Sequence, residues 1–203
     1  MTFRNCLLLG IYSNLFFIAF ILFCLMYYDL YRDSGEAVRE FEIIAMSLEA
    51  IGFFIMTMSI FMMIVLVQGR LLLKISMAAY LLIEVTVMAL DFTLLEWEWY
   101  DGYAPWLIIA HAIVSAFVCM TYLTLDKRNK HLQISVGVSA AVMLAGMLAI
   151  AFGQRIYISV LTNTFAYMIL YNAMIVLMRY DILIVDCYGY KAEVKEYRSS
   201  FFE

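Results

Sequence analysis

The sequence predicts an all-α fold, a polytopic membrane helical bundle with about six transmembrane helices and both termini cytoplasmic. Of the 203 residues, 66% are hydrophobic, and the mean hydropathy is +0.91. Only 15% are charged, against about 25% in ordinary soluble domains. The apolar residues come in runs of about twenty, the length that crosses roughly 30 Å of hydrocarbon. We therefore expect one membrane domain over residues 1–179 and a cytoplasmic or interfacial tail over 180–203.

The first apolar run, 6–28, follows Arg4 as the core of a signal peptide would. It is longer than a signal core, and no small-residue cleavage site follows it, so we expect a retained helix. Polar punctuation along the rest of the chain predicts further helices over 43–67, 72–95, 105–125, 132–153 and 156–178. The intervening segments are an external charged loop at 29–42, basic turns at 68–74 and 126–131, an acidic aromatic loop at 96–105 and a tight turn at 154–155.

Lysines and arginines predict the orientation, because short basic loops are retained in the cytoplasm. With both termini inside, three basic residues fall outside: Arg32, Arg39 and Arg155. Ten fall inside: Arg4, Arg70, Lys74, Lys127, Arg128, Lys130, Arg179, Lys191, Lys195 and Arg198. The bias favours a multi-pass protein of the cell membrane in this orientation.

Small residues recur every four positions on the fifth predicted helix, at Gly137, Ala141, Ala145, Ala149 and Gly153. In lipid, close helix contact depends on such small residues, because apolar side chains gain little by leaving one apolar medium for another. We expect this ridge to be a packing face within the bundle.

Polar residues inside the apolar runs are the candidate site. They are Glu49, Glu84, Asp91, His111 and Asn163. An ionisable group in hydrocarbon costs about 2.5 kcal/mol or more, so such groups normally face a partner or a wet cavity. Helix directions place Glu84 near the midplane and the other four in the outer third of the bilayer.

Three predicted helices also carry polar lines at helical spacing. The lines are Glu84, Asp91 and Glu98; His111, Ser115, Cys119 and Tyr122; and Ser159, Asn163, Tyr167 and Tyr171. If they converge, they form an outward-opening acidic cavity that attracts a proton, a metal cation or a small cationic solute. Glu84 is then the deepest carboxylate, and His111 is the natural hydrogen-bond partner of Asp91 or Glu49.

Structural interpretations compete with each of these roles. Glu49 and Asp91 are equally consistent with interfacial residues, and His111 with a cross-link between helices. Glu84 is consistent with a neutral, buried glutamic acid that holds two helices together.

The loop before the fourth predicted helix interleaves carboxylates with aromatic rings, at Trp97, Glu98, Trp99 and Asp101. This composition suits the external mouth of a cation site. An interfacial aromatic belt explains the same residues.

No recognised catalytic, metal-binding or phosphate-binding motif occurs, so we expect no enzyme, no metal and no cofactor. His111 and Cys119 are eight residues apart, about 12 Å along a helix, and cannot form a dyad on it. The four cysteines predict no structural disulfide, and the net charge of −4 without a basic block gives no indication of nucleic-acid binding.

Three functions remain open. The first is binding or transport of a proton, cation or small cationic solute through the acidic cavity. The second is a membrane sensor that couples an external ligand to a cytoplasmic protein partner through the tail. The third is a non-catalytic immunity or assembly protein whose carboxylates only lock the bundle. The lipid bilayer is the one partner common to all three.

Overall fold

The computed structural model describes residues 2–34, 39–93, 97–151 and 156–188. These residues form six α-helices and one short 3-10 helix. The helices are α1 (Phe3–Ser34), α2 (Arg39–Leu66), α3 (Leu71–Thr93), α4 (Trp97–Thr121), η1 (Tyr122–Thr124), α5 (Lys130–Ala151) and α6 (Ile156–Arg179).

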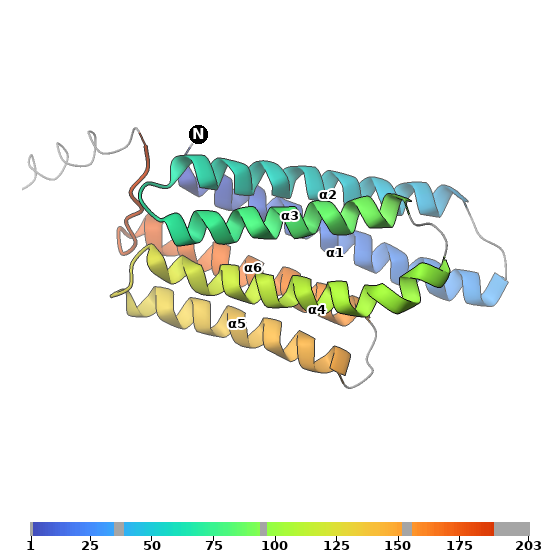
Figure 1. The fold of residues 1–203 in the computed structure, drawn as a ribbon. Helices are drawn as coiled ribbons and strands as arrows, with labels where there is room; N and C mark the ends of the chain where they lie inside the picture. Colours follow the sequence, from blue (N-terminus) through green and yellow to red (C-terminus); the bar gives the residue numbers. More distant parts are fainter. Residues whose placement is uncertain (1, 35–38, 94–96, 152–155, 189–203) are drawn as a thin grey trace, which may run out of the picture.

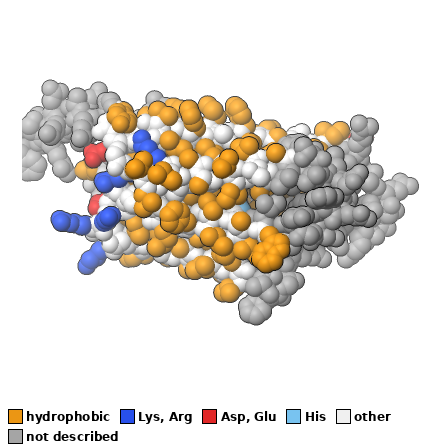
Figure 2. All heavy atoms as spheres, viewed as in Figure 1, with side chains coloured by type: hydrophobic (Ala, Val, Ile, Leu, Met, Phe, Trp, Pro, Cys, Tyr) orange, Lys and Arg blue, Asp and Glu red, His pale blue; other side chains and the backbone are white. Residues whose placement is uncertain are grey.

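The six helices lie side by side along one direction and form an elongated bundle (Figure 1). Each helix packs against the next along the chain, α6 also packs against α1, and α4 contacts α6 across the bundle. Five helices in the described part of the chain are long and apolar enough to cross a membrane, and α4 contributes a shorter apolar stretch, Ile109–Thr124. Large hydrophobic side chains are exposed along the middle of the visible face, whereas lysines and arginines gather at one end (Figure 2). The molecule is therefore a helical bundle suited to a membrane.

Two predicted loops are largely helical, which corrects the sequence-based boundaries. Helix α1 continues to Ser34 and α2 begins at Arg39, so the charged segment 29–42 is mostly helix. Helix α4 begins at Trp97, so residues 97–105 of the acidic aromatic segment are also helical. Hydropathy marks where a chain leaves hydrocarbon, but a helix satisfies its own backbone groups and continues into a polar medium. Pro105 therefore does not mark the start of α4.

The described part of the small-residue ridge of α5 faces outward, so its prediction as an internal packing face was wrong there, while the Ala149 side chain and Gly153 lie outside the described part. Gly137, Ala141 and Ala145 are exposed, and a Cβ added to Gly137 meets no other atom within 4 Å. The buried side of α5 instead carries Leu132, Val136, Ser139 and Met143. Because α5 packs through these larger residues, its smooth face points away from the bundle.

The chain after α6 folds back across the basic end of the bundle. We call residues 180–188 the strap. The carbonyl of Asp186 accepts a hydrogen bond from Gln68 N at 2.9 Å, and Tyr188 N donates to the Leu66 carbonyl at 2.9 Å. Asn129 Nδ2 donates to the Ile182 carbonyl at 2.8 Å. The first part of the predicted tail thus docks on its own bundle, and residues 189–203 lie outside the described part.

The strap is anchored by buried side chains as well as by its backbone. Leu183 is 2% exposed and Cys187 is 7% exposed. Burial raises the pKa of the Cys187 thiol, and the charge of Asp186 adds to that effect. The α2–α3 turn, the α4–α5 turn, and both described chain ends lie at this end of the bundle (Figure 1). We refer to it as the basic end.

Candidate functional site: a half-buried acid–histidine pair

The centre of the candidate site is a direct contact between Glu84 of α3 and His111 of α4. Nε2 of His111 is hydrogen-bonded to Oε1 of Glu84. The side chains are 14% and 20% exposed, respectively. The carboxylate and the imidazole share one hydrogen bond, so the pair is either ionised or neutral according to where the proton lies. Moving that proton from one group to the other leaves the net charge of the pair at zero, whereas uptake of a further proton gives the pair a net charge of +1.

Asn163 of α6 joins the pair to a third helix. Its Nδ2 lies 3.4 Å from Nδ1 of His111 and donates to Ser115 Oγ at 3.1 Å. The hydroxyl of Tyr167, one turn further along α6, donates to the Ser115 carbonyl at 3.1 Å. His111 is thereby held from both ring nitrogens. The polar lines predicted on the fourth and sixth helices do converge here.

Four tyrosines continue the polar region from the pair toward the basic end. The Tyr80 ring lies 5.4 Å from the His111 ring and 5.9 Å from the Tyr167 ring, measured between centroids. Tyr167 lies 5.6 Å from Tyr171, and Tyr171 lies 6.1 Å from Tyr122. The Tyr122 hydroxyl donates to the Tyr171 hydroxyl at 3.5 Å. Hydroxyl groups thus line the interior where a membrane bundle is usually apolar.

A cavity of about 20 Å³ lies among these tyrosines. A polar cavity needs roughly 10–15 Å³ to hold one water molecule, so this one has room for a single water. Its polar lining comes from Asn14, Ser59, Tyr80, Tyr122, Tyr167 and Tyr171. The volume is far too small for an organic cation.

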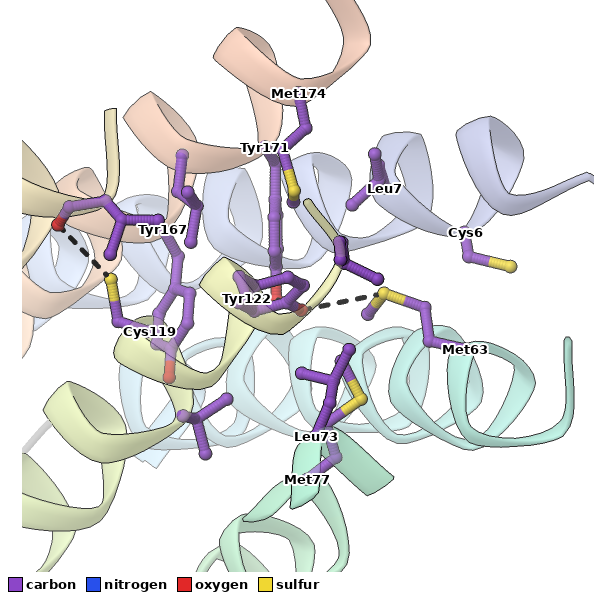
Figure 3. Close-up of a cluster of buried hydrophobic side chains, with 14 of the residues drawn as sticks. Cys6, Leu7, Met63, Leu73, Met77, Cys119, Tyr122, Tyr167, Tyr171 and Met174 are labelled. Carbon is purple, nitrogen blue, oxygen red and sulfur yellow. Dashed lines mark hydrogen bonds between the residues drawn. The ribbon is translucent and has the colours of Figure 1, made fainter. Parts of the chain in front are cut away.

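Apolar side chains separate this cavity from the basic end. Leu7, Met63, Leu73 and Met174 are fully buried around Tyr122. Figure 3 shows them surrounding the Tyr122 ring, whose hydroxyl points toward Met63 Sδ at 3.6 Å. The interior is therefore closed by an apolar layer on the side of the chain ends.

The structure brings three of the five predicted intramembrane residues together: Glu84, His111 and Asn163. The expectation that His111 pairs with Asp91 or Glu49 is corrected, because its observed partner is Glu84. Glu84 lies near the middle of α3, and its long side chain reaches across to α4. The depth of a residue along its helix does not reveal how far its side chain reaches sideways. Glu49 lies on α2 near Cys24 of α1.

The side chains of the remaining predicted site residues lie outside the described part of the structure. Asp91 is near the end of α3, and Trp97, Glu98, Trp99 and Asp101 are in the first turns of α4. Their roles as ligands or as an external mouth stay predictions. The outward-opening cavity that they would line stays one as well.

Sequence reasoning did not single out Tyr80, Asn14 and Ser59 as part of the site. Tyrosine, serine and asparagine are common in membrane helices as packing or interfacial residues, so each alone is a weak signal. One signal was present for Tyr80: it precedes Glu84 by four residues and so shares its helix face.

Among the described residues, no group of three or more His, Cys, Asp or Glu side chains is placed to hold a metal ion. No protein-family model matches the chain, and comparison with curated proteins and with solved structures found no match either. Fold and site together define a class: a multi-helix bundle suited to a membrane with a hydrogen-bonded acid–histidine pair in its interior.

Proposed function

We propose that this protein binds a proton at the Glu84–His111 pair and transports it across the membrane. The observation that carries the proposal is the direct contact between the two side chains inside an apolar bundle. Each group alone would be costly to charge there, whereas together they exchange between a neutral and an ionised pair by moving one proton.

Within the described part of the chain, the geometry supports a proton over the other cations considered. A metal ion prefers several oxygen or nitrogen ligands, whereas the Glu84 carboxylate is already engaged by His111. An organic cation needs a volume many times that of the tyrosine-lined cavity of about 20 Å³. A proton needs only the pair itself.

The first test compares Glu84→Gln with Glu40→Gln in detergent-purified protein, by thermal stability at a series of pH values. Glu40 is exposed at the start of α2, so the control makes the same chemical change outside the site. We expect the wild type and Glu40→Gln to show the same pH-dependent Tm, and Glu84→Gln to lose that dependence, because glutamine cannot take up the proton.

A second measurement separates binding from transport. Liposomes that carry the wild-type protein and enclose a pH-sensitive dye should become acidic inside when the outer solution is made acidic. Liposomes that carry Glu84→Gln should not. If Glu84→Gln only shifts Tm by a constant amount at all pH values and flux is unchanged, then Glu84 is a structural cross-link. The interaction-protein hypothesis, in which the carboxylates lock the bundle, would then lead.

One observation favours the sensor hypothesis as a second candidate. The strap joins the C-terminal tail to the α2–α3 and α4–α5 turns, so a helix displacement at the site has a physical connection to the tail. Deleting residues 189–203 should leave flux intact if the protein is a transporter. If the deletion abolishes a signalling response in cells while proton binding by the protein is unchanged, sensing would be favoured.

A further inference from the structure

We propose that the tyrosine-lined cavity binds one water molecule, which together with Tyr80 forms the inner proton path from Glu84. This inference rests on the proposed function and adds to it the route by which the proton leaves the pair.

Tyr80 lies between the pair and the cavity. It precedes Glu84 by one helical turn on α3, so both side chains share one face. Its ring lies against His111, it interacts with the Glu84 carboxylate, and it also lines the cavity. Its hydroxyl also lies 3.7 Å from Met56 Sδ, a weak acceptor that lines the cavity. Because a tyrosine oxygen accepts as well as donates, the same hydroxyl can accept a hydrogen bond from a water in the cavity.

The cavity also offers the polar atoms that hold a water molecule. Asn14 Nδ2 donates to the Gly10 carbonyl at 2.6 Å, which leaves Asn14 Oδ1 as an acceptor. Ser59 Oγ donates to the Cys6 carbonyl at 2.7 Å and keeps its lone pairs. The Tyr171 hydroxyl accepts from Tyr122 and has its own proton to donate. A bound water commonly makes about three hydrogen bonds, which this lining supplies.

The proton balance of the step is simple. A proton that arrives on the water passes to the oxygen of Tyr80 while the hydroxyl proton of Tyr80 moves to the carboxylate of Glu84. The water and the tyrosine are restored, and the carboxylate becomes a carboxylic acid. The reverse sequence delivers a proton from Glu84 to the water.

Depth along the helices agrees with a path toward the basic end. Counting from the helix ends at that side, Gly10 and Ser59 lie roughly 11 Å deep, Tyr80 roughly 14 Å and Glu84 roughly 20 Å. Beyond the cavity stand Met63, Leu73 and Met174, which are fully buried and apolar. The path ends at this layer. Transport therefore requires the layer to open, and the closed layer prevents a leak of protons.

The test is Tyr80→Phe in the full-length protein in liposomes, with Tyr12→Phe as the matched control. Tyr12 is 54% exposed on α1, so Tyr12→Phe removes the same hydroxyl group at a position outside the cavity. We expect Tyr80→Phe to lower proton flux about 100-fold, the lower end of what a positioned proton-transfer group contributes, and Tyr12→Phe to leave it unchanged. Titration of the Glu84 carboxyl, followed by its infrared carbonyl band, should persist in both variants.

The outcomes separate the route from the site. If Tyr80→Phe carries the same flux as Tyr12→Phe, the proposed path is wrong while proton binding at Glu84 stands. If the wild type carries no flux but its Glu84 band titrates, the path is also overturned. If the band does not titrate in the wild type, the proposed function fails and the path fails with it. A Tyr171→Phe variant should give an intermediate flux, because the Tyr122 hydroxyl still lines the cavity.

Discussion

At the scale of single residues, Gly10 sets how closely α1 approaches the site. A Cβ added there would lie 2.5 Å from Tyr171 Cε2 and 3.3 Å from Ser59 Oγ. Both neighbours line the tyrosine-lined cavity, and Tyr171 is only 5% exposed. The ring also contacts the rings of Tyr167 and Tyr122, so it has little room to retreat, and glycine is favoured here by space.

Gly10→Ala should therefore destabilise the protein by about 1–3 kcal/mol, the usual cost of overpacking a well-packed interior. The matched control is Gly137→Ala on α5, where nothing lies within 4 Å of the added atom. The control should be neutral or stabilising, by up to about 1 kcal/mol, because alanine is the better helix former. Unfolding in mixed micelles, followed by circular dichroism, measures both. Equal stability of the two variants would mean that α1 does not pack on Tyr171 in this way.

The three central residues of the site were predictable because each one conflicts with its surroundings. Glu84, His111 and Asn163 stand in apolar runs, and the cost of such groups in hydrocarbon identifies them without a structure. The pairing itself was not predictable, since depth along a helix says nothing about how far a side chain reaches sideways. Tyr80 and Ser59 were not identified because their side chains are ordinary in membrane helices.

At the scale of elements, α5 shows the limit of pattern reasoning. The four-residue recurrence of Gly137, Ala141 and Ala145 correctly predicts a smooth helix face, but that face points outward. Periodicity tells which residues share a face, and it does not tell which neighbour the face meets. The helix is held instead by the side that carries Val136 and Met143.

Ala141→Leu should accordingly change the free energy of unfolding by no more than about 0.5 kcal/mol, as is usual for an exposed position. Met143→Ala should cost about 2–5 kcal/mol, because Met143 is 1% exposed and its removal leaves a cavity. Denaturant titration of the two variants in the same micelles gives the comparison. A strongly destabilised Ala141→Leu would indicate that the ridge is covered in the membrane, for instance by another copy of the chain.

The order and approximate positions of the described helices were predictable, whereas their lengths were not. The apolar runs locate the six helices of the described part, yet α1 and α4 extend several residues beyond theirs. The hydrocarbon core limits the apolar run, and the backbone remains helical past it, because the helix already satisfies its hydrogen bonds.

At the scale of the whole molecule, the basic end of the bundle combines positive charge with contacts from the chain after α6. The basic end carries Arg70, Lys74, Lys127, Arg128 and Arg179, and the strap crosses it (Figures 1 and 2). The Arg70 guanidinium donates to the Leu125 carbonyl at 3.1 Å, and Lys74 Nζ lies 5.7 Å from the Tyr188 ring centroid. Some of the basic side chains that predict orientation therefore also join the strap and turns together.

Because short basic segments stay in the cytoplasm, the basic end should face the cytoplasm. Glu40 at the start of α2 and Arg128 in the α4–α5 turn are both exposed and lie at opposite ends of the bundle. With the four native cysteines replaced by alanine, we expect a membrane-impermeant maleimide to label Glu40→Cys in intact cells. It should label Arg128→Cys only after the cells are permeabilised.

The reverse labelling pattern would change the meaning of the site as well as the topology. With the basic end outside, the apolar layer of Met63, Leu73 and Met174 would close the outer side. The Glu84–His111 pair would then take protons from the cytoplasm, and the path through Tyr80 would lead outward. Labelling of both cysteines in intact cells would instead show that α2 and the α4–α5 turn are on one side, which an antiparallel membrane bundle with this helix order does not allow. The orientation measurement therefore decides the direction in which the proposed path operates.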